Sequence, residues 1–258
     1  MNVPVRAMKY GVRRYAGRLA ALVGAATSAA ALAGPSYVTD DPEPTELGKW
    51  EIYAFGSGTD FKRSVQGESG FDINYGGGKN LQLSAVASLG CSRDRGRPVR
   101  VGISDTELGA KYRFLHQREG SWMPDVGLFP KIELPTATRG FGSGKLGFSL
   151  PFWAQKDFGP WSLFGGAGWA LNPGAGNRNY GFGGIALTRQ FTKRLSVGAE
   201  TYHQTADAVD TRSSTGLGLG ASWQIAPKWS IIGSGGPLLT HRATAGDYAV
   251  YIALELHD

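Results

Sequence analysis

The chain contains a single cysteine, Cys91, so it cannot form an internal disulfide. Cys91 also lies far from the amino terminus, which excludes a lipoprotein anchored through this residue. Beyond the first 33 residues the sequence has no long hydrophobic run suited to a helix. Its uncharged stretch 158–177 holds Pro160, Pro173 and several glycines, which disfavour a helix. These absences exclude a disulfide scaffold and a bundle of membrane helices.

Residues 1–33 have the features of a signal peptide. Five Lys or Arg residues and no acidic residue precede the apolar stretch 19–33, which ends in Ala31-Leu32-Ala33. This stretch has 15 residues, whereas a membrane helix needs about 20. We therefore expect export and cleavage after Ala33. Loss of the five positive charges lowers the formal net charge from +6 to +1, and no basic patch remains to bind nucleic acid.

A period of two dominates the remaining sequence. Along residues 106–114, apolar residues alternate with a set that includes Glu107, Lys111 and Arg113. Such alternation places the two kinds of side chain on opposite faces of a strand. Similar patterns predict twelve strands, at 47–58, 67–76, 79–89, 105–116, 123–134, 146–157, 160–171, 180–191, 194–205, 213–225, 228–236 and 246–256. Their lengths suit tilted membrane strands of about 9–11 residues.

The connections between the predicted strands alternate in length. Each odd-numbered connection is longer than the even-numbered one that follows it, and the even set includes the two-residue turns 77–78, 158–159, 192–193 and 226–227. Outer-membrane barrels show this asymmetry, with short periplasmic turns and longer outer loops. We therefore predict an all-β fold, a transmembrane antiparallel up-and-down β-barrel of about twelve strands. An exported soluble β-sandwich is the alternative fold.

Charged residues of the predicted strands gather on the face opposite to the apolar one. In lipid every backbone polar group must be paired, so a sheet can span the membrane only without an edge. The apolar face would then contact lipid, and the polar face would line the lumen. A soluble barrel would instead bury these charges, at a cost of several kcal/mol for an unpaired charge. The predicted lumen-lining and solute-binding residues are Glu51, Asp72, Asn74, Glu107, Lys111, Arg113, Lys131, Glu133 and Glu200.

Aromatic residues concentrate at the predicted strand ends that meet the short turns. They are Trp50, Tyr75, Trp161, Trp223 and Trp229. Trp and Tyr favour a membrane–water interface because one end of the ring system is apolar and the other polar. We expect an aromatic girdle at this level, with ordinary core aromatics as the alternative.

Eight short segments stand out in order along the chain: 38–44 (VTDDPEP), 74–76 (NYG), 105–114 (DTELGAKYRF), 129–136 (FPKIELPT), 142–144 (GSG), 172–177 (NPGAGN), 203–207 (HQTAD) and 212–216 (RSSTG). Together they resemble the outer-membrane family named for the meta pathway of phenol degradation. The resemblance covers nearly all of the chain after residue 33. It implies an outer-membrane barrel, a channel or transporter for small solutes, aromatic ones included. It supplies no catalytic residues.

The residues leave two other functions open. A barrel whose lumen is filled by ion pairs would be structural and would transport nothing. The second is an outer-membrane hydrolase, because His203, Asp207 and Ser213 or Ser214 border one predicted outer loop. Since no nucleophile motif surrounds these residues, we expect no enzyme.

The predicted organisation is a signal peptide at 1–33, an extended segment at 34–46 and a barrel at 47–258. Asp40, Asp41, Glu43 and Glu46 offer oxygen ligands, but they lack the spacing of a calcium loop. We therefore expect no metal and no cofactor. The expected partners are outer-membrane lipid and lipopolysaccharide, a small-molecule solute and the barrel-assembly machinery.

Overall fold

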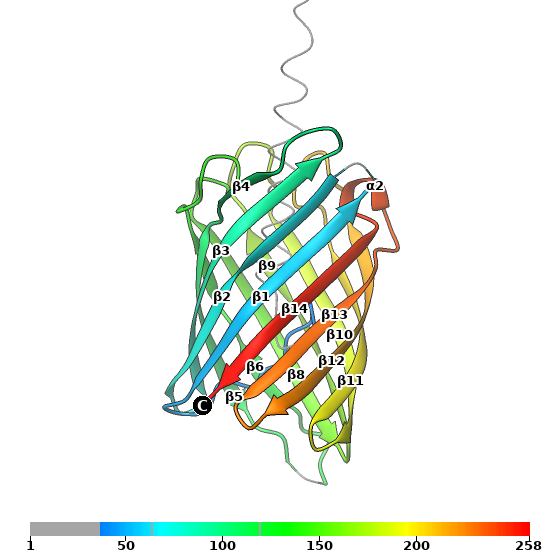
Figure 1. Cartoon of the computed structure of the whole chain (residues 1–258). Helices are drawn as coiled ribbons and strands as arrows, with labels where there is room; N and C mark the ends of the chain where they lie inside the picture. Colours follow the sequence, from blue (N-terminus) through cyan, green and yellow to red (C-terminus); the bar gives the residue numbers. More distant parts are fainter. Residues whose placement is uncertain (1–36, 63, 119) are drawn as a thin grey trace, which may run out of the picture.

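The computed structural model describes residues 37–62, 64–118 and 120–258, which form one closed antiparallel sheet (Figure 1). The predicted signal peptide, 1–33, lies outside the described residues. The strands are β1 (Trp50–Phe61), β2 (Ser64–Gly78), β3 (Leu81–Asp94), β4 (Arg100–Ile103), β5 (Thr106–Leu115), β6 (Asp125–Leu128), β7 (Lys131–Leu134), β8 (Gly147–Phe158), β9 (Trp161–Leu171), β10 (Tyr180–Thr192), β11 (Leu195–Gln204), β12 (Ser214–Ala226), β13 (Trp229–Pro237) and β14 (Tyr248–His257). The described residues include one short helix, α2 (Arg242–Ala245), between β13 and β14. No helix among them is long and apolar enough to cross a membrane.

The fourteen strand segments make twelve barrel strands. β4 and β5 both pair with β3, and β6 and β7 both pair with β5 and β8, so each pair forms one interrupted barrel strand. At the second interruption, Pro130 lacks a backbone N–H. The carbonyl of Pro130 still accepts from the N–H of Ala110 (3.1 Å), and the N–H of Phe129 donates to the carbonyl of Pro151 (3.0 Å).

The sheet closes where the first and last strands meet. β1 pairs with β14 from Glu51 opposite His257 to Asp60 opposite Tyr248. Figure 1 shows these two strands side by side and strongly tilted, as barrel closure requires. The prediction of a closed antiparallel barrel of twelve strands is therefore confirmed.

Several predicted strand ends and one connection are wrong. We expected residues 59–66 to be a loop, but Phe61 pairs with Ser64, so the β1–β2 connection is as short as the periplasmic-type turns. β3 extends through Asp94, which pairs with Ser64, and β4 lies inside the predicted connection 90–104. Glycine and polar residues weaken the alternation there, while the backbone pairing continues beyond the apolar part of each strand.

The outward positions of the strands form an exposed apolar belt. Leu219 is 72% exposed and Ile252 is 61% exposed, whereas Ala253, the inward-facing neighbour of Ile252, is 3% exposed. A soluble monomer rarely exposes an apolar patch larger than a few hundred Å². Hydrocarbon around the barrel accounts for the belt, because lipid-facing and lumen-facing residues alternate along a membrane strand.

The predicted aromatic residues lie at the end of the barrel that carries the short turns. Trp50, Trp161, Trp223 and Trp229 face outward and are 37–55% exposed. The ring of Trp50 lies 4.6 Å from that of Tyr75, centroid to centroid. This placement matches the expected girdle at one membrane interface.

The interior is less polar than the alternation predicts. Trp153, Phe164, Phe182 and Phe129 are all buried on inward positions, in two aromatic clusters. β8, β9 and β10 carry apolar residues on both faces, so the period of two gives no sign of which face turns inward. The lumen wall is therefore aromatic along β8, β9 and β10, and most of the predicted charged residues lie on β2, β5 and β7.

Candidate functional site

All nine predicted lumen residues occupy inward positions. Five of them are buried, namely Asn74, Glu107, Lys111, Lys131 and Glu200. The other four are half-buried, namely Glu51, Asp72, Arg113 and Glu133. The alternation that exposes their apolar neighbours to the outside turns these side chains toward the lumen.

The described part of the predicted extended segment, residues 37–46, lies inside the lumen. The carboxylate of Glu200, on β11, accepts hydrogen bonds from the backbone N–H groups of Val38 (3.1 Å) and Thr39 (2.9 Å). Tyr37 packs edge-to-face on Phe164 of β9, with ring centroids 6.0 Å apart. We call residues 37–46 the inner segment.

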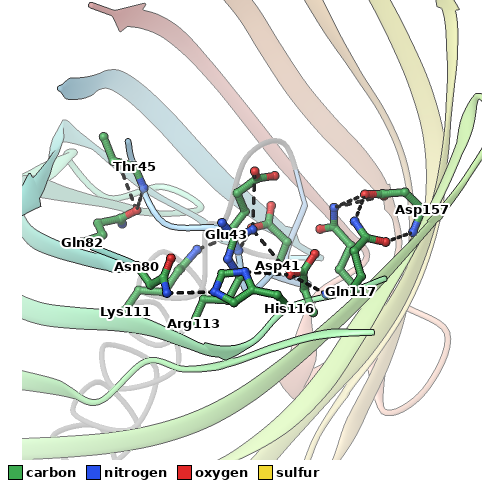
Figure 2. A network of polar contacts seen from close by, with 12 residues as sticks. Asp41, Glu43, Thr45, Asn80, Gln82, Lys111, Arg113, His116, Gln117 and Asp157 are labelled. Carbon is green, nitrogen blue, oxygen red and sulfur yellow. Dashed lines mark hydrogen bonds and ion pairs between the residues drawn. The ribbon is translucent and has the colours of Figure 1, made fainter. Parts of the chain in front are cut away.

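Lys111 of β5 holds the middle of the inner segment. Its ammonium Nζ lies 2.9 Å from a carboxylate oxygen of Asp40. It lies 3.8 Å from a carboxylate oxygen of Asp41, and Figure 2 shows the side chains of Lys111 and Asp41. Burial raises the pKa of Asp41 to about 7, and neighbouring Asp40 adds to the rise while Lys111 opposes it. Asp40 and Asp41 therefore serve as partners of a buried cation in the lumen.

Arg113, two residues further along β5, lies between the inner segment and the wall. Its guanidinium is 3.7 Å from Glu43 and 3.6 Å from Asp125, in both cases to a carboxylate oxygen. Burial raises the pKa of Glu43, and Arg113 opposes this rise. Figure 2 shows Arg113, Glu43 and Lys111 converging from β5 and the inner segment.

A chain of hydrogen bonds fixes the end of the inner segment. Both the N–H and the hydroxyl of Thr45 donate to the amide oxygen of Gln82, at 2.9 and 3.0 Å. The amide N–H of Gln82 donates to Asn74 (2.6 Å), whose own amide donates to Asp72 (3.0 Å). Two of the predicted residues, Asn74 and Asp72, thus support the segment through Gln82, which the sequence did not single out.

A second buried cation lies beside the first. Lys131 of β7 contacts a carboxylate oxygen of Glu107 on β5 at 3.1 Å. Both cations lie over the ring of Phe129. The ring centroid is 4.4 Å from Nζ of Lys131 and 5.1 Å from Nζ of Lys111. Cation–π contact and ion pairing together offset the burial of the two charges.

Glu51 and Glu133 form none of the ion pairs described above. Glu51 accepts a hydrogen bond from the hydroxyl of Tyr53 (3.3 Å) near the short-turn end. Glu133 lies opposite Glu107 in the register between β5 and β7, and its side chain approaches Gly147 of β8. The structure therefore gathers seven of the nine predicted residues in and around the ion-paired network and leaves two on the wall beside it.

The inner segment lies between two cavities. The outer chamber, about 870 Å³ including space open to solvent, is bordered by the outer loops and lined by Val38, Phe61, Trp153, Phe182, Tyr202 and Leu238 among others. The basal chamber, about 860 Å³ on the same measure, is lined by Asp40, Asp41, Glu51, Asp72, Glu107, Lys111 and Lys131 among others. The two chambers differ in chemistry, since the first combines aromatic with mainly uncharged polar side chains and the second is largely charged.

Glycines on the wall make room for the inner segment. A Cβ atom added at Gly184 would lie 2.1 Å from the hydroxyl oxygen of Thr39, and one at Gly220 would lie 2.7 Å from the ring of Tyr37. Glycine is abundant in the sequence, at 39 residues, but its abundance alone does not predict this function. The sequence does carry a sign of it, because glycine recurs at inward positions of β10, β11 and β12. Wall side chains that filled the lumen themselves would have to stand at these positions.

The predicted hydrolase residues have other partners. His203 shares a 2.8 Å hydrogen bond with the hydroxyl of Thr215, and Asp207 accepts from the hydroxyl of Thr211 (2.8 Å) and from Gln204 (3.2 Å). In the part of the chain that the structure describes, no three His, Cys, Asp or Glu residues are grouped to hold a metal ion.

Comparison with known proteins places the chain in one family. Residues 64–252 match the family described as "Putative MetA-pathway of phenol degradation". The COG4313 outer membrane channel from Pseudomonas putida F1 has a similar structure, with a TM-score of 0.66 and 16% identity over 84% of this chain and 98% of that chain. The NanC porin has a TM-score of 0.53 and 9% identity over 80% of this chain and 99% of that chain.

At these identities the two solved structures establish the fold alone, and a search of curated proteins finds no sequence match. The family model, by contrast, spans well over half of the sequence. The chain therefore belongs to the family described as "Putative MetA-pathway of phenol degradation" and has the fold of an outer-membrane β-barrel.

Proposed function

We propose that the protein is a channel of the bacterial outer membrane for small solutes, aromatic ones included. The observation that carries the proposal is the pair of chambers, one on each side of the inner segment, inside a barrel with an apolar outer belt. A twelve-stranded barrel is wider than one of eight strands, whose interior side chains fill, and narrower than a sixteen-stranded porin. Such a lumen suits single small molecules.

The two chambers would offer a solute two different environments, one after the other. Phe61, Phe182 and Trp153 offer aromatic contact on the outer side. Charged and amide groups such as Asp72 and Lys111 line the basal side. A solute that leaves the aromatic chamber would enter a hydrated, polar compartment, and the inner segment would be the constriction between them.

The nine predicted lumen residues enter this proposal in two ways. Glu200, Lys111 and Arg113 hold the inner segment, so they set how narrow the constriction is. Glu51, Asp72, Asn74, Glu107, Lys131 and Glu133 line the wall, where lumen residues tune selectivity. The structurally similar Pseudomonas putida protein is described as an outer membrane channel, which agrees with this function.

Single-channel recording in planar bilayers tests the proposal. The protein is refolded, and a heat-dependent shift on unboiled gels establishes that the barrel is closed. We expect discrete conductance steps, small for a barrel of this width because the inner segment narrows it. Swelling of proteoliposomes in small solutes measures passage of uncharged molecules. A folded barrel that gives neither current nor swelling would reject the channel.

A structural barrel without transport is the second candidate. The ion pairs of Lys111 and Arg113 with the inner segment favour it, because they fill part of the lumen. We further propose that the protein is not an enzyme, consistent with the separate partners of His203 and Asp207. No ester hydrolysis above that of a Ser213→Ala/Ser214→Ala variant is expected.

Export and the remaining partners stay predictions. Cleavage after Ala33 is measured by mass spectrometry of the protein extracted from outer membranes, which should begin at Gly34. Contact with lipopolysaccharide and insertion by the barrel-assembly machinery follow from an outer-membrane location. We expect no cofactor, no metal and no nucleic acid to be needed.

A further inference from the structure

A charged side chain, that of Arg189 on β10, stands on the outward face of the barrel among apolar neighbours. In the register of the sheet Arg189 lies opposite Trp161 of β9 on one side and opposite Val197 of β11 on the other. Along β10 the nearest outward positions are Leu187 and Phe191. These four neighbours are 37–56% exposed and belong to the apolar outer face. Because a charge on the lipid face destabilises a membrane barrel, the position of Arg189 calls for an explanation.

The guanidinium of Arg189 is held by two aromatic rings. Its Cζ lies 5.2 Å from the ring centroid of Trp161 and 5.0 Å from that of Phe191. Cation–π contact stabilises the charge, but it supplies no oxygen acceptor for the five N–H donors of a guanidinium. Within the described part of the chain, no ion pair or side-chain hydrogen bond involves Arg189. The side chain is therefore positioned by its neighbours while its donors remain available.

Arg189 lies at the level of the aromatic girdle and not at the middle of the belt. It is three residues from the end of β10 at Thr192, and Trp161 is the first residue of β9. Both strand ends meet short turns, which in an outer-membrane barrel face the periplasm. The leaflet on that side consists of phospholipids, and interfacial Trp side chains lie at the level of their headgroups. The guanidinium is thus placed within reach of a lipid phosphate.

We propose that Arg189, Trp161 and Phe191 form a binding site for the phosphate of a phospholipid in the periplasmic leaflet. The N–H groups of Arg189 donate to the phosphate oxygens, and the two rings fix the guanidinium at the surface of the barrel. Arginine suits this function because its planar group pairs with a phosphate through two N–H groups and also contacts aromatic rings. Leu187, nearer the membrane centre, contacts the acyl chains. The site goes beyond the proposed function, since it requires no solute to pass.

Three lipids with the same acyl chains test which part of the lipid is recognised. Phosphatidylglycerol and phosphatidylethanolamine both carry a phosphate, under different headgroups, and diacylglycerol carries none. The refolded full-length protein in a non-ionic maltoside detergent is titrated with each lipid, and bound lipid is counted by native mass spectrometry. We expect one site that binds both phospholipids, and that binds diacylglycerol about tenfold more weakly.

Variants of Arg189 assign this preference to the guanidinium. Arg189→Leu removes the charge and leaves an apolar side chain on the lipid face, so it should bind phosphatidylglycerol about tenfold more weakly and diacylglycerol as the wild type does. Arg189→Lys keeps the charge but loses the paired N–H groups, so its affinity should be intermediate. The matched control is Arg118→Leu, which removes an exposed arginine from the connection between β5 and β6, at the same end of the barrel. It should change nothing.

Two results would overturn the site. One is equal affinity of the wild type for phosphatidylglycerol and diacylglycerol, and the other is an equal loss of affinity in Arg189→Leu and Arg118→Leu. In either case Arg189 merely extends toward water, as long basic side chains do at a membrane surface. If Arg189→Leu gives no heat-modifiable barrel, Arg189→Gln is judged by the same comparison. Conductance plays no part in these measurements, so a silent barrel would reject the channel and leave the site in place.

Discussion

Replacing Glu200 with alanine should release the inner segment from the wall. The Glu200 carboxylate accepts two backbone N–H groups, from Val38 and Thr39, across more than 160 residues of sequence. A hydrogen bond to a charged group contributes about 1.5–3 kcal/mol. Because water can replace part of these interactions, we assume a net loss of about 3 kcal/mol for the two hydrogen bonds together. A loss of this size raises the ratio of undocked to docked inner segment about a hundredfold.

Thiol labelling measures this release. The reporter is Thr39→Cys in a Cys91→Ser background, because Thr39 is 1% exposed and the exposed native thiol of Cys91 must be removed. We expect Glu200→Ala to speed labelling of the reporter by up to about a hundredfold, with larger single-channel steps. The control, Glu133→Ala, removes another lumen carboxylate whose described neighbours lie on the wall. Equal labelling rates in Glu200→Ala and the control would refute the reasoning.

Three further predictions concern the lipid face, the basal chamber and pH. Leu219→Arg places a charge on the outer belt halfway along β12 and should destabilise the folded barrel by about 2–4 kcal/mol, measured by urea titration in liposomes; Ser222→Arg, on the inward face, should cost less. Asp72→Asn together with Glu51→Gln should lower the preference for cations over anions in salt-gradient reversal potentials, and an unchanged potential would contradict the acidic character of the basal chamber. Because burial raises the pKa of Asp41 from 3.8 to about 7, the docked segment takes up a proton in this range, so docking strengthens as pH falls from about 7 toward 4. Labelling of Thr39→Cys, normalised to the unfolded protein, should therefore slow at pH 5, and Asp41→Asn should make the change smaller, with the remainder coming from Glu43, whose pKa burial also raises.

The closed barrel could be predicted because its alternation is simple where one face is charged. Along β5, Glu107, Lys111 and Arg113 mark the inward face, and their apolar neighbours mark the lipid face. Along β9 and β10 this contrast disappears, because Phe164 and Phe182 face inward beside apolar residues that face outward. Local sequence therefore identified the charged part of the lumen wall and missed the aromatic part along β8 to β10.

The contacts of the inner segment lay beyond sequence reasoning for a different reason. Glu200 and Lys111 were selected as lumen residues, but their partners at 38–41 are far away in the sequence. Such pairs arise only when the register of the whole sheet is fixed. Gln82 was missed because a neutral amide on a strand carries no sign of its partner.

The sites that hold the inner segment also constrain the order in which the protein can assemble. Lys111 lies on β5 and Glu200 on β11, so the two anchors come into position around residues 38–41 only after most strands have joined. The segment precedes β1 in synthesis but must dock among the last parts. Until then the newly closed cylinder would be a wider, water-filled tube, in which Lys111 depends on hydration rather than on Asp40 and Asp41 for its stabilisation.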